Sequence, residues 1–422
     1  MLTAAIAGLG LVLASLLWVE VVRDFYHALA HYWTPLMRLH NWHHRVFRPD
    51  LTPVSQAIYR KAQWYHDLPE SLVMLSFSFL PMALAFTWQL PNSWMTWIGP
   101  VYSLTFLAGA IARGIGLPLA EELTDITHRP GDFVELPHPW LVNRSYHWRH
   151  HFDNPQAYYS GTLTLVDKLL GTALSLKGKR IAVTGASGAL GQSLLKQLQT
   201  HQAKVIALTS QSQPITLDFD GHKISLETHS WRVGEEDCLS DVLSRVDILI
   251  INHGVNVLGD RTPEAIHRSY EVNTFSSWRL MEHFFKTVVT NKDKVCKEVW
   301  INTSEAETNP ALSPLYELSK RSLGDLITLR RLDAPCVVRK LILGPFKSQL
   351  NPFGIMSSDW VAKQILNLAQ RDIRNIIVTI NPITFILFPL KEFFVSWYFK
   401  LFSRSAKTAT NTVTSSLQTT HK

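Results

Sequence analysis

The sequence has few cysteines for its length. Three among 422 residues, Cys238, Cys296 and Cys336, are too scattered for a disulfide framework and favour a reducing compartment. The sequence also lacks a block of lysine and arginine with interleaved aromatic residues, so its net charge of +7 does not predict a nucleic-acid partner. Positive charge beside membrane spans is the simpler explanation.

Long uncharged apolar runs occur at residues 2–19, 71–90 and 95–112, and each can span or nearly span a bilayer. The first run lacks a basic start and a cleavage site, so we expect a retained anchor and not a signal peptide. A fourth run, 381–404, contains Lys391, Glu392, Lys400 and Arg404 and favours a helix lying in the membrane interface over a span. The alternative for this run is a helix packed on the preceding domain.

Charge predicts the topology. Residues 23–67 carry six basic side chains, which would cost on the order of 18 kcal/mol inside the bilayer, whereas the loop at 91–94 carries none. We therefore expect an integral, multi-pass protein in which 23–67 and everything after about residue 113 face the cytosol. The expected divisions are a helical membrane domain at 1–172, an α/β domain at 173–380, the interfacial helix at 381–404 and a disordered tail at 405–422.

Histidines cluster in the first domain in three patterns. HxxxH, HxxHH and HxxHH place imidazoles three and four residues apart, on one face of a helix, at His27 and His31, at His40, His43 and His44, and at His147, His150 and His151. Imidazole suits iron, zinc and copper. No HExxH occurs, and eight histidines exceed the needs of one zinc ion, although zinc remains the second choice. The spacing predicts a mostly imidazole site for two metals on one side of a membrane.

These patterns, together with HHFDNPQAYYSGTLTLVDKLLGT, resemble the fatty acid hydroxylase and sterol desaturase superfamily over residues 1–172. The resemblance implies a di-iron centre that oxidises a lipid C–H bond, with those eight histidines as ligands and His66 and His128 as further ones. His138, before Pro139, is interpreted as a loop residue. No haem-attachment or iron–sulfur cysteine spacing is present, so an external electron donor, ferredoxin-like or cytochrome b5-like, would be required.

A glycine-rich turn opens the second domain. The apolar strand expected at 180–184 leads into Gly185, Gly188 and Gly191 and then a helical stretch. This order of strand, turn and helix is typical of a dinucleotide site, in which the helix N-terminus faces the pyrophosphate.

Tyr316 and Lys320 form an i, i+4 pair in YELSK, so the lysine charge favours the tyrosinate. Ser304, after a second buried strand, can hydrogen-bond a substrate oxygen. With Asn252 and Gly254 in NHG and Asn273 in YEVNTF, the set resembles the short-chain dehydrogenase/reductase family over residues 178–380. The resemblance implies a doubly wound parallel Rossmann sheet and Ser304, Tyr316, Lys320 and Asn273 as catalytic residues.

Several details depart from that family's commonest pattern: GxxGxxG replaces GxxxGxG, NHG replaces NAG, Ser304 lies one residue closer to Tyr316, and LGPFKS inverts the proline-glycine segment. No acidic residue follows the second strand, where Thr209 and Ser210 stand, which favours NADP over NAD. The expected cofactor contacts are Thr184, Gly185, Ser187, Gly188, Gly191, Thr209, Ser210, Asn252, Gly254, Tyr316 and Lys320.

Taken together, the two halves resemble bifunctional sterol desaturase/short-chain dehydrogenase fusions. They predict a membrane enzyme that hydroxylates or desaturates a fatty acyl or sterol-like lipid and interconverts an alcohol and a carbonyl. Two alternatives are an enzyme like the plant wax aldehyde decarbonylases and a non-catalytic membrane scaffold that senses NADP(H). A degenerate second domain that binds nucleotide without turnover also stays open.

Overall fold

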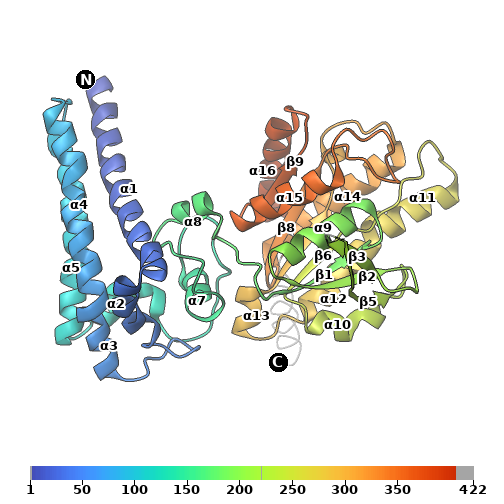
Figure 1. The fold of residues 1–422 in the computed structure, drawn as a ribbon. Helices are drawn as coiled ribbons and strands as arrows, with labels where there is room; N and C mark the ends of the chain where they lie inside the picture. The colour runs from blue at the N-terminus through green and yellow to red at the C-terminus, as the bar shows by residue number, and fades with distance from the viewer. Residues whose placement is uncertain (1, 220, 405–422) are drawn as a thin grey trace, which may run out of the picture. The chain divides into compact units, whose positions relative to one another are not determined.

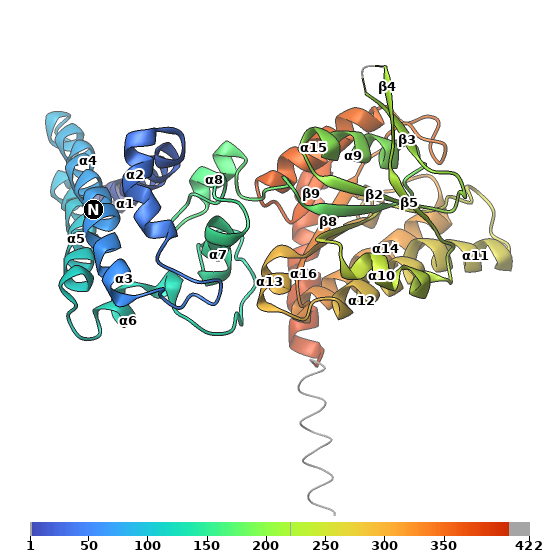
Figure 2. The ribbon, with the colours of Figure 1, turned by 60° about the horizontal axis from the view of Figure 1, so that its bottom comes forward.

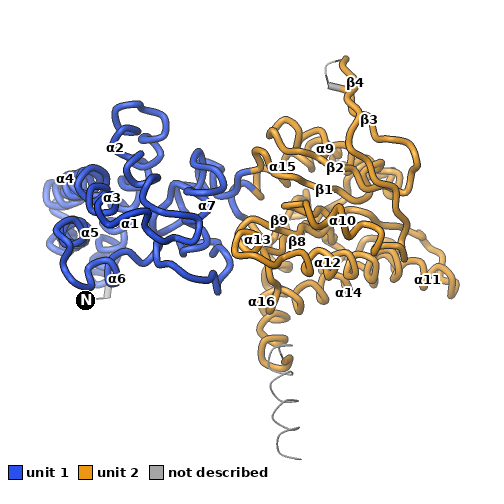
Figure 3. Tube along the Cα trace, turned by 90° about the horizontal axis from the view of Figure 1, so that it is seen from below, with its two compact units in different colours: residues 1–175, 370–372 blue, residues 176–369, 373–422 orange. Residues whose placement is uncertain are grey.

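The computed structural model describes residues 2–219 and 221–404, and the chain divides into two compact units (Figure 3). Unit 1 comprises residues 1–175 with 370–372, and unit 2 comprises 176–369 with 373–422. The tail expected at 405–422 lies outside the described residues.

Unit 1 is built from helices, with short π or 3-10 turns labelled η. In chain order they are α1 (Leu2–Tyr32), α2 (Thr34–His44), α3 (Gln56–Ala62), η1 (Gln63–Asp67), α4 (Leu68–Thr87), η2 (Ser93–Trp97), α5 (Ile98–Ile115), α6 (Ala120–Thr124), η3 (Ile126–His128), α7 (Arg144–Phe152) and α8 (Leu165–Leu170). This confirms the expected helical N-terminal region.

Helices α1, α4 and α5 lie side by side (Figures 1 and 2). Thr3–Tyr32, Gln56–Thr87 and Ser93–Ile115 are long and apolar enough to cross a membrane, and they contain most of the three predicted runs. Large apolar side chains on their outer faces are exposed, among them Leu9, Phe77 and Leu104. A wide apolar surface of this kind marks contact with lipid or with another protein.

Side-chain caps start α3, which leads to His66, and α7, which carries three histidines. Ser55 accepts a hydrogen bond from the Ile58 amide at 3.2 Å and begins α3, and Asn143 accepts one from the Tyr146 amide at 3.0 Å and begins α7. Between α3 and α4 the chain makes one turn of π-helix, η1, which contains His66. Such turns insert one residue into a helix and often occur at functional sites.

Unit 2 contains a seven-stranded sheet in the order β5-β2-β1-β6-β7-β8-β9, and every neighbouring pair is parallel. The strands are β1 (Arg180–Thr184), β2 (Lys204–Thr209), β5 (Glu227–Ser230), β6 (Ile248–Ile251), β7 (Glu298–Asn302), β8 (Val337–Leu343) and β9 (Asn375–Val378). An antiparallel hairpin, β3 (Thr216–Phe219) and β4 (His222–Ser225), stands apart from this sheet.

Helices cover both faces of the sheet, with α9 and α15 on one side and α10, α12 and α14 on the other (Figure 2). The expected parallel α/β architecture is therefore confirmed. The helices and turns of the unit are α9 (Ala189–Thr200), η4 (Glu236–Leu239), α10 (Ser240–Ser244), α11 (Pro263–Tyr270), η5 (Glu271–Phe275), α12 (Ser276–Lys286), α13 (Asn291–Cys296), η6 (Glu305–Glu307), α14 (Pro314–Arg330), η7 (Arg331–Asp333), α15 (Ser358–Gln370) and α16 (Thr384–Phe402).

The central strands are buried along their whole length, as two-sided coverage requires. All four residues of β6 and all seven of β8 are buried, although β8 includes Arg339 and Lys340. Arg339 Nε lies 2.7 Å from a Glu298 carboxylate oxygen on β7, and both side chains are fully buried. Opposite charges on adjacent strands thus make this polar interior possible.

Candidate functional sites

One cavity in unit 1 gathers the histidines of distant segments. Ring contacts join all ten predicted ligands into one cluster: His27 and His31 on α1, His40, His43 and His44 on α2, His66 on η1, His128 on η3, and His147, His150 and His151 on α7. Five of them, His27, His43, His66, His128 and His147, line the cavity. The cavity beside them has a volume of about 520 Å³. Five chain segments therefore supply imidazoles to one place.

The histidines form two groups of four whose ring nitrogens converge. In the first, ligand atoms of His27, His31, His40 and His150 lie within 4.8 Å of one another. His27 Nε2 is 2.9 Å from His150 Nε2, and His31 Nε2 is 2.9 Å from His40 Nε2. His44 lies at the edge, with its Nε2 3.5 Å from His31 Nε2.

The second group contains His43, His128, His147 and His151. Its Nε2 atoms are 2.9 Å apart for His128 and His147, 3.1 Å for His147 and His151, and 3.2 Å for His128 and His151. Two nitrogens bound about 2.1 Å from one metal ion and at right angles lie about 3.0 Å apart. The spacing of these three nitrogens therefore fits a metal ion.

His43 also belongs to a smaller group with His66 and Asp67, which has not been predicted from the sequence as a set. The Nδ1 atoms of His40 and His66 are 3.4 Å apart. Through these contacts His66 lies between the two four-histidine groups.

Two histidines are held in orientation by hydrogen bonds at Nδ1. His150 donates from Nδ1 to the Ala157 carbonyl oxygen at 2.8 Å, and His128 Nδ1 lies 2.5 Å from Asp125 Oδ1. Tyr59 donates to the other Asp125 oxygen at 3.0 Å. Such contacts fix the tautomer and leave Nε2 free for a metal.

Sequence reasoning missed Asp125, although its position three residues before His128 is a usable signal. Asp167, which lies in the segment HHFDNPQAYYSGTLTLVDKLLGT that carries the resemblance, accepts hydrogen bonds from the Tyr146 hydroxyl and from the amides of Tyr159 and Ser160, each at 2.8 Å. These contacts hold the segment after α7 beside the histidines.

The protonation state of the cluster suits metal binding. Burial first, and then neighbouring imidazoles, hold the pKa of His43, His147, His150 and His151 well below the ordinary value. The same causes lower the pKa of His44 to about 3. These rings are neutral at pH 7, and the neutral imidazole is the form that coordinates a metal.

His138 has a different environment. Its Nδ1 accepts hydrogen bonds from the amides of Trp140 at 3.2 Å and Leu141 at 3.0 Å. The ring therefore shapes the loop that leads to α7.

In unit 2, the glycine turn between β1 and α9 is tightly packed. Gly185 has φ +63°, and a Cβ on Gly191 would lie 2.2 Å from the Gly185 carbonyl oxygen. Gly188 is the N-cap of α9, and no side chain caps that helix start. The N-terminal amides of a twelve-residue helix thus meet a turn that only glycine can form, an arrangement that fits a pyrophosphate.

Neighbouring strand ends meet this turn. Thr184 at the end of β1 accepts hydrogen bonds from the amides of Asn252 at 2.8 Å and His253 at 3.2 Å. At the end of β2, Thr209 donates to Ser187 in the turn at 3.2 Å, and Ser210 is exposed. The carboxyl edge of a parallel sheet is where such folds bind their ligands.

Ser304, Tyr316 and Lys320 lie together beyond β7. The Tyr316 and Ser304 side chains are hydrogen-bonded, and Lys320 Nζ is 5.9 Å from the centre of the Tyr316 ring. Lys320 also donates to the Asn302 carbonyl oxygen at 2.8 Å. Burial raises the pKa of Tyr316 while its bond to Ser304 lowers it, and burial lowers the pKa of Lys320 to about 8.

Asn273 lies on the π turn η5 and is hydrogen-bonded to the loop that follows β6. Its Oδ1 accepts from the Val255 amide at 2.8 Å, and its Nδ2 donates to the Val255 carbonyl at 2.9 Å and to Ser319 at 3.0 Å. It therefore connects α14, which carries Tyr316 and Lys320, to the segment after β6. Gly254 lies beside it, since a Cβ there would be 3.2 Å from Asn273 Oδ1.

His253, the departure within NHG, is buried beside these residues. Its Nδ1 is 2.9 Å from the Thr184 hydroxyl, and its ring meets that of Trp231 edge-on at 5.2 Å. Burial first, and then the charge of Lys320, lower its pKa to about 3. This histidine is therefore neutral and structural in character across the physiological range.

Two kinds of comparison with known proteins concern unit 2. The model of the NAD dependent epimerase/dehydratase family matches residues 181–306, which contain the glycine turn and Asn273. A short chain dehydrogenase from Burkholderia cenocepacia, solved in complex with NADP, covers 55% of this chain and all of its own at 17% identity and a TM-score of 0.43. An alcohol dehydrogenase from Thermococcus sibiricus covers 48% of this chain and 95% of its own at 17% identity and a TM-score of 0.40.

One relative spans both units. The monoglucosyldiacylglycerol epimerase of Synechocystis sp. (strain ATCC 27184 / PCC 6803 / Kazusa) is 62% identical over 410 residues, which cover 96% of this chain and 100% of that protein. The match therefore covers both the helical unit and the α/β unit of this chain. The chain belongs to the family of this monoglucosyldiacylglycerol epimerase.

Proposed function

We propose that the chain inverts one carbinol carbon in the sugar head group of a glucosyl diacyl lipid, using a nicotinamide cofactor in unit 2. The hydrogen-bonded pair of Tyr316 and Ser304 beside Lys320 carries this proposal. The family of the chain supplies the class of substrate.

Elementary chemistry favours redox over proton transfer for this reaction. The carbinol C–H bonds of a glycoside are not acidic, because no carbonyl group stands next to them. Removal of a hydride gives a planar carbonyl carbon, which can be reduced again from the opposite face. A nicotinamide bound at the glycine turn would accept that hydride and return it.

The residues of unit 2 would handle the proton. Tyr316, as the phenolate, takes the hydroxyl proton during oxidation and returns it during reduction. Lys320 favours the phenolate by its charge, and Ser304 holds the substrate oxygen by a hydrogen bond. Inversion further requires the sugar carbonyl to present both faces in turn, so the site must let the sugar ring rotate.

NADP remains the favoured form of the cofactor. The chain places Thr209 and Ser187, joined at 3.2 Å, where an acidic residue would hold the ribose hydroxyls of NAD. The two hydroxyl groups can donate hydrogen bonds to the oxygens of a 2′-phosphate. Comparison of the Kd values for NADPH and NADH tests this preference, and tighter binding of NADH would contradict it.

Epimerisation in D₂O tests the reaction. The purified full chain, reconstituted with a monoglucosyl diacyl lipid and NADP(H), is expected to give inverted sugar with no deuterium bound to carbon, since the hydride returns from the nicotinamide. Deuterium at the inverted carbon would contradict the redox route. Absence of any inverted sugar, with cofactor bound, would overturn the proposed function itself.

The histidine cavity supports a second candidate function, a metal-dependent oxidation of a lipid C–H bond in unit 1. The observation in its favour is the convergence of two four-imidazole groups, with His128 and His150 oriented from behind. His27, His31, His40 and His150 would hold one ion, and His43, His128, His147 and His151 the other. Iron bound there would supply dioxygen chemistry with two electrons from an external donor.

For this second function, the purified protein is expected to contain transition metal, and a lipid product with one oxygen more or two hydrogens fewer is expected in cells that express it. Metal-free protein with unchanged lipid products would contradict it. The predicted resemblance of residues 1–172 to the hydroxylase and desaturase superfamily stays a prediction that this experiment tests.

We also propose that both units meet a membrane. Unit 1 supplies its three long apolar helices. In unit 2, two charged residues of α16 pair with residues of the same unit, Glu392 with Lys340 at 2.8 Å and Lys391 with Glu307 at 3.0 Å, whereas Lys400 near the end of the helix is exposed. The outer face of α16 is apolar and exposed, with Phe393, Phe394 and Trp397 among the exposed side chains. A helix that pairs two of its charges within its own unit and exposes its aromatic residues suits the bilayer interface.

A further inference from the structure

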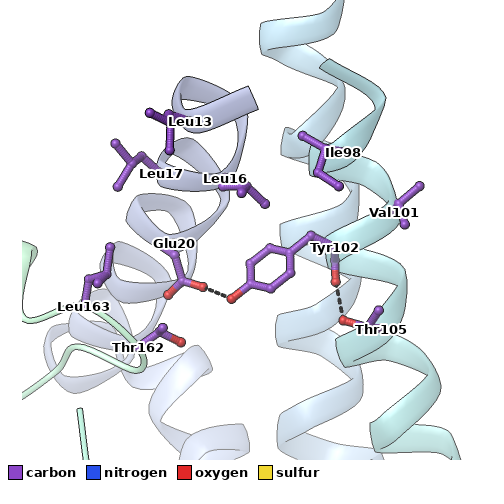
Figure 4. Close-up of a pocket in the computed structure, with 10 residues that line it drawn as sticks. All are labelled: Leu13, Leu16, Leu17, Glu20, Ile98, Val101, Tyr102, Thr105, Thr162 and Leu163. Atoms are coloured by element: carbon purple, nitrogen blue, oxygen red, sulfur yellow. Dashed lines mark hydrogen bonds between the residues drawn. The ribbon is translucent and has the colours of Figure 1, made fainter. Parts of the chain in front are cut away.

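An apolar groove lies between α1 and α5 in unit 1, separate from the histidine cavity but adjacent to it. Its volume is about 540 Å³ (Figure 4). Six apolar side chains form its walls: Leu13, Leu16, Leu17, Ile98, Val101 and Leu163. Leu13 and Val101 are each 52% exposed, so the groove opens sideways where the two candidate spans face outward.

A polar floor closes one end of the groove. Tyr102 on α5 points at Glu20 on α1 and donates a hydrogen bond to it, as Figure 4 shows. Glu20 pairs with Arg23, and Arg23 donates to the Thr162 hydroxyl at 2.9 Å. Charged residues in an apolar helix are costly and are kept where they pair and act, so the floor is a built feature.

The same floor borders the histidine cavity. Thr105 and Thr162 line both the groove and that cavity, and Arg23, the partner of Glu20, lines the cavity. The floor is therefore a polar boundary between the apolar groove and the histidine cavity.

We propose that the groove binds one acyl chain of a diacyl membrane lipid, with the ester end of the chain against the Glu20–Tyr102 floor and the tail along Leu16 and Leu13. The walls of the groove are aliphatic and therefore suit a hydrocarbon chain. The groove opens on the outer surface of two candidate membrane spans, which would face the bilayer. Since the chain enters the groove from lipid and not from water, the gain in free energy comes from close packing. The polar floor selects the orientation, because a terminal methyl would desolvate these hydroxyl and carboxylate groups without replacing their contacts.

The proposal rests on the proposed membrane placement of unit 1, and it requires no metal in the cavity. Its first test is native mass spectrometry of the full chain released gently from nanodiscs of phosphatidylglycerol and monoglucosyldiacylglycerol. Wild-type protein is expected to retain one diacyl lipid. Leu13→Trp and Val101→Trp, which fill the groove from opposite walls, are expected to lower the retained fraction at least fivefold.

Leu9→Trp is the matched control, because Leu9 is one turn away on the same exposed face of α1 and does not line the groove. Equal lipid retention in all four proteins would overturn the proposal. An unchanged circular dichroism spectrum and melting temperature of each variant show that its helical unit is folded. If alkaline washing removes the wild type from membranes, the placement of unit 1 fails instead, which separates the two failures.

A second measurement fixes the orientation. Lipids that carry a photoreactive diazirine near the ester or near the terminal methyl are cross-linked in the nanodiscs, and labelled peptides are identified by mass spectrometry. The probe near the ester is expected to label α5 around Tyr102 and Thr105, and the probe near the methyl to label α1 around Leu13. The reverse pattern would overturn the proposed orientation. Loss of both patterns in Val101→Trp but not in Leu9→Trp would confirm the groove as the source.

Discussion

The two units build their sites in opposite ways. In unit 2, Thr184 ends β1, and Asn252 and Ser304 follow β6 and β7, the next two strands of the same parallel sheet, so the sheet edge itself brings them together. In unit 1, the ten histidines come from five helical segments whose packing has no such edge. A sheet edge positions a few unlike residues for proton transfer, whereas packed helices present many identical donors around a centre.

One device is common to both units. Each places a candidate site residue on a single π turn, His66 on η1 and Asn273 on η5. The extra residue in each turn rotates the side chain relative to the helix on either side. The two units therefore differ in the chemistry of their donor groups and in the scaffold that holds them, so a substitution in one unit can be judged against the other.

The largest expected effect is that of Tyr316→Phe. Removal of the hydroxyl eliminates the proton acceptor, so we expect the epimerase rate to fall by about 10²–10⁴-fold. NADPH binding and the metal content of unit 1 should not change. Rates are measured by separating the sugar lipids chromatographically, with Tyr270→Phe as the control on α11. A variant that keeps more than a tenth of the wild-type rate would argue against Tyr316 as the base.

His147→Ala tests unit 1. His147 Nε2 is within 3.1 Å of two partner nitrogens, so its loss should release the ion held by the second group. We expect elemental analysis of the purified variant to show less metal per chain, with epimerase activity unaffected. His138→Ala, in the loop before α7, should retain full metal. A parallel loss of epimerase activity in His147→Ala would show that the two units do not function independently.

The features that could be predicted from the sequence are those that depend on local spacing and on the order of the strands. Tyr316 and Lys320 share a face of one helix, Gly185 and Gly191 bracket one turn, and HxxHH fixes three imidazoles on a short helix, so each arrangement follows from spacing alone. Proximity of His27 to His150, 123 residues apart, depends on tertiary packing. It was inferred because a common ligand type suggested a common centre.

Other features had no local signal. The inward direction of Glu392 on α16 depends on Lys340, a charged residue inside β8 that strand patterning would place elsewhere. The hairpin of β3 and β4 and the two π turns also escaped prediction, since each is a departure from a regular period. Glu20 and Tyr102 are 82 residues apart, and nothing in the sequence pattern predicted their contact, because Glu20 lies just beyond the uncharged run 2–19.

Asp125→Asn should have an intermediate effect. The carboxylate lies 2.5 Å from His128 Nδ1, and loss of such an orienting partner lowers metal affinity by about 10–100-fold. Competition with a chelator of known affinity measures this shift. Asp50→Asn, in an exposed loop, is the control and should leave the affinity as in wild type. An unchanged affinity in Asp125→Asn would mean that Asp125 does not orient a ligand.

The exposed face of α16 gives a smaller, spectroscopic effect. Phe393→Cys, in a background where exposed Cys238 is replaced by Ser, is labelled with a polarity-sensitive dye in the nanodisc-bound full chain. We expect blue-shifted emission, because the dye enters the interface. Lys363→Cys on α15 is the exposed control and should report water. Equal emission from both positions would contradict an interfacial α16.

The smallest effect concerns pH and unit 2. Burial lowers the pKa of Lys320 to about 8, so its positive charge beside Tyr316 is lost as the pH rises through that value. We therefore expect kcat/KM of the wild type to decline above pH 8, by up to about tenfold at pH 9. Lys320→Arg keeps the charge, since arginine stays protonated. Its absolute rate should be lower because the guanidinium fits the site less well, but its decline should move to higher pH. An identical alkaline limb in both proteins would assign that limb to another group and leave Lys320 with a structural role through its bond to Asn302.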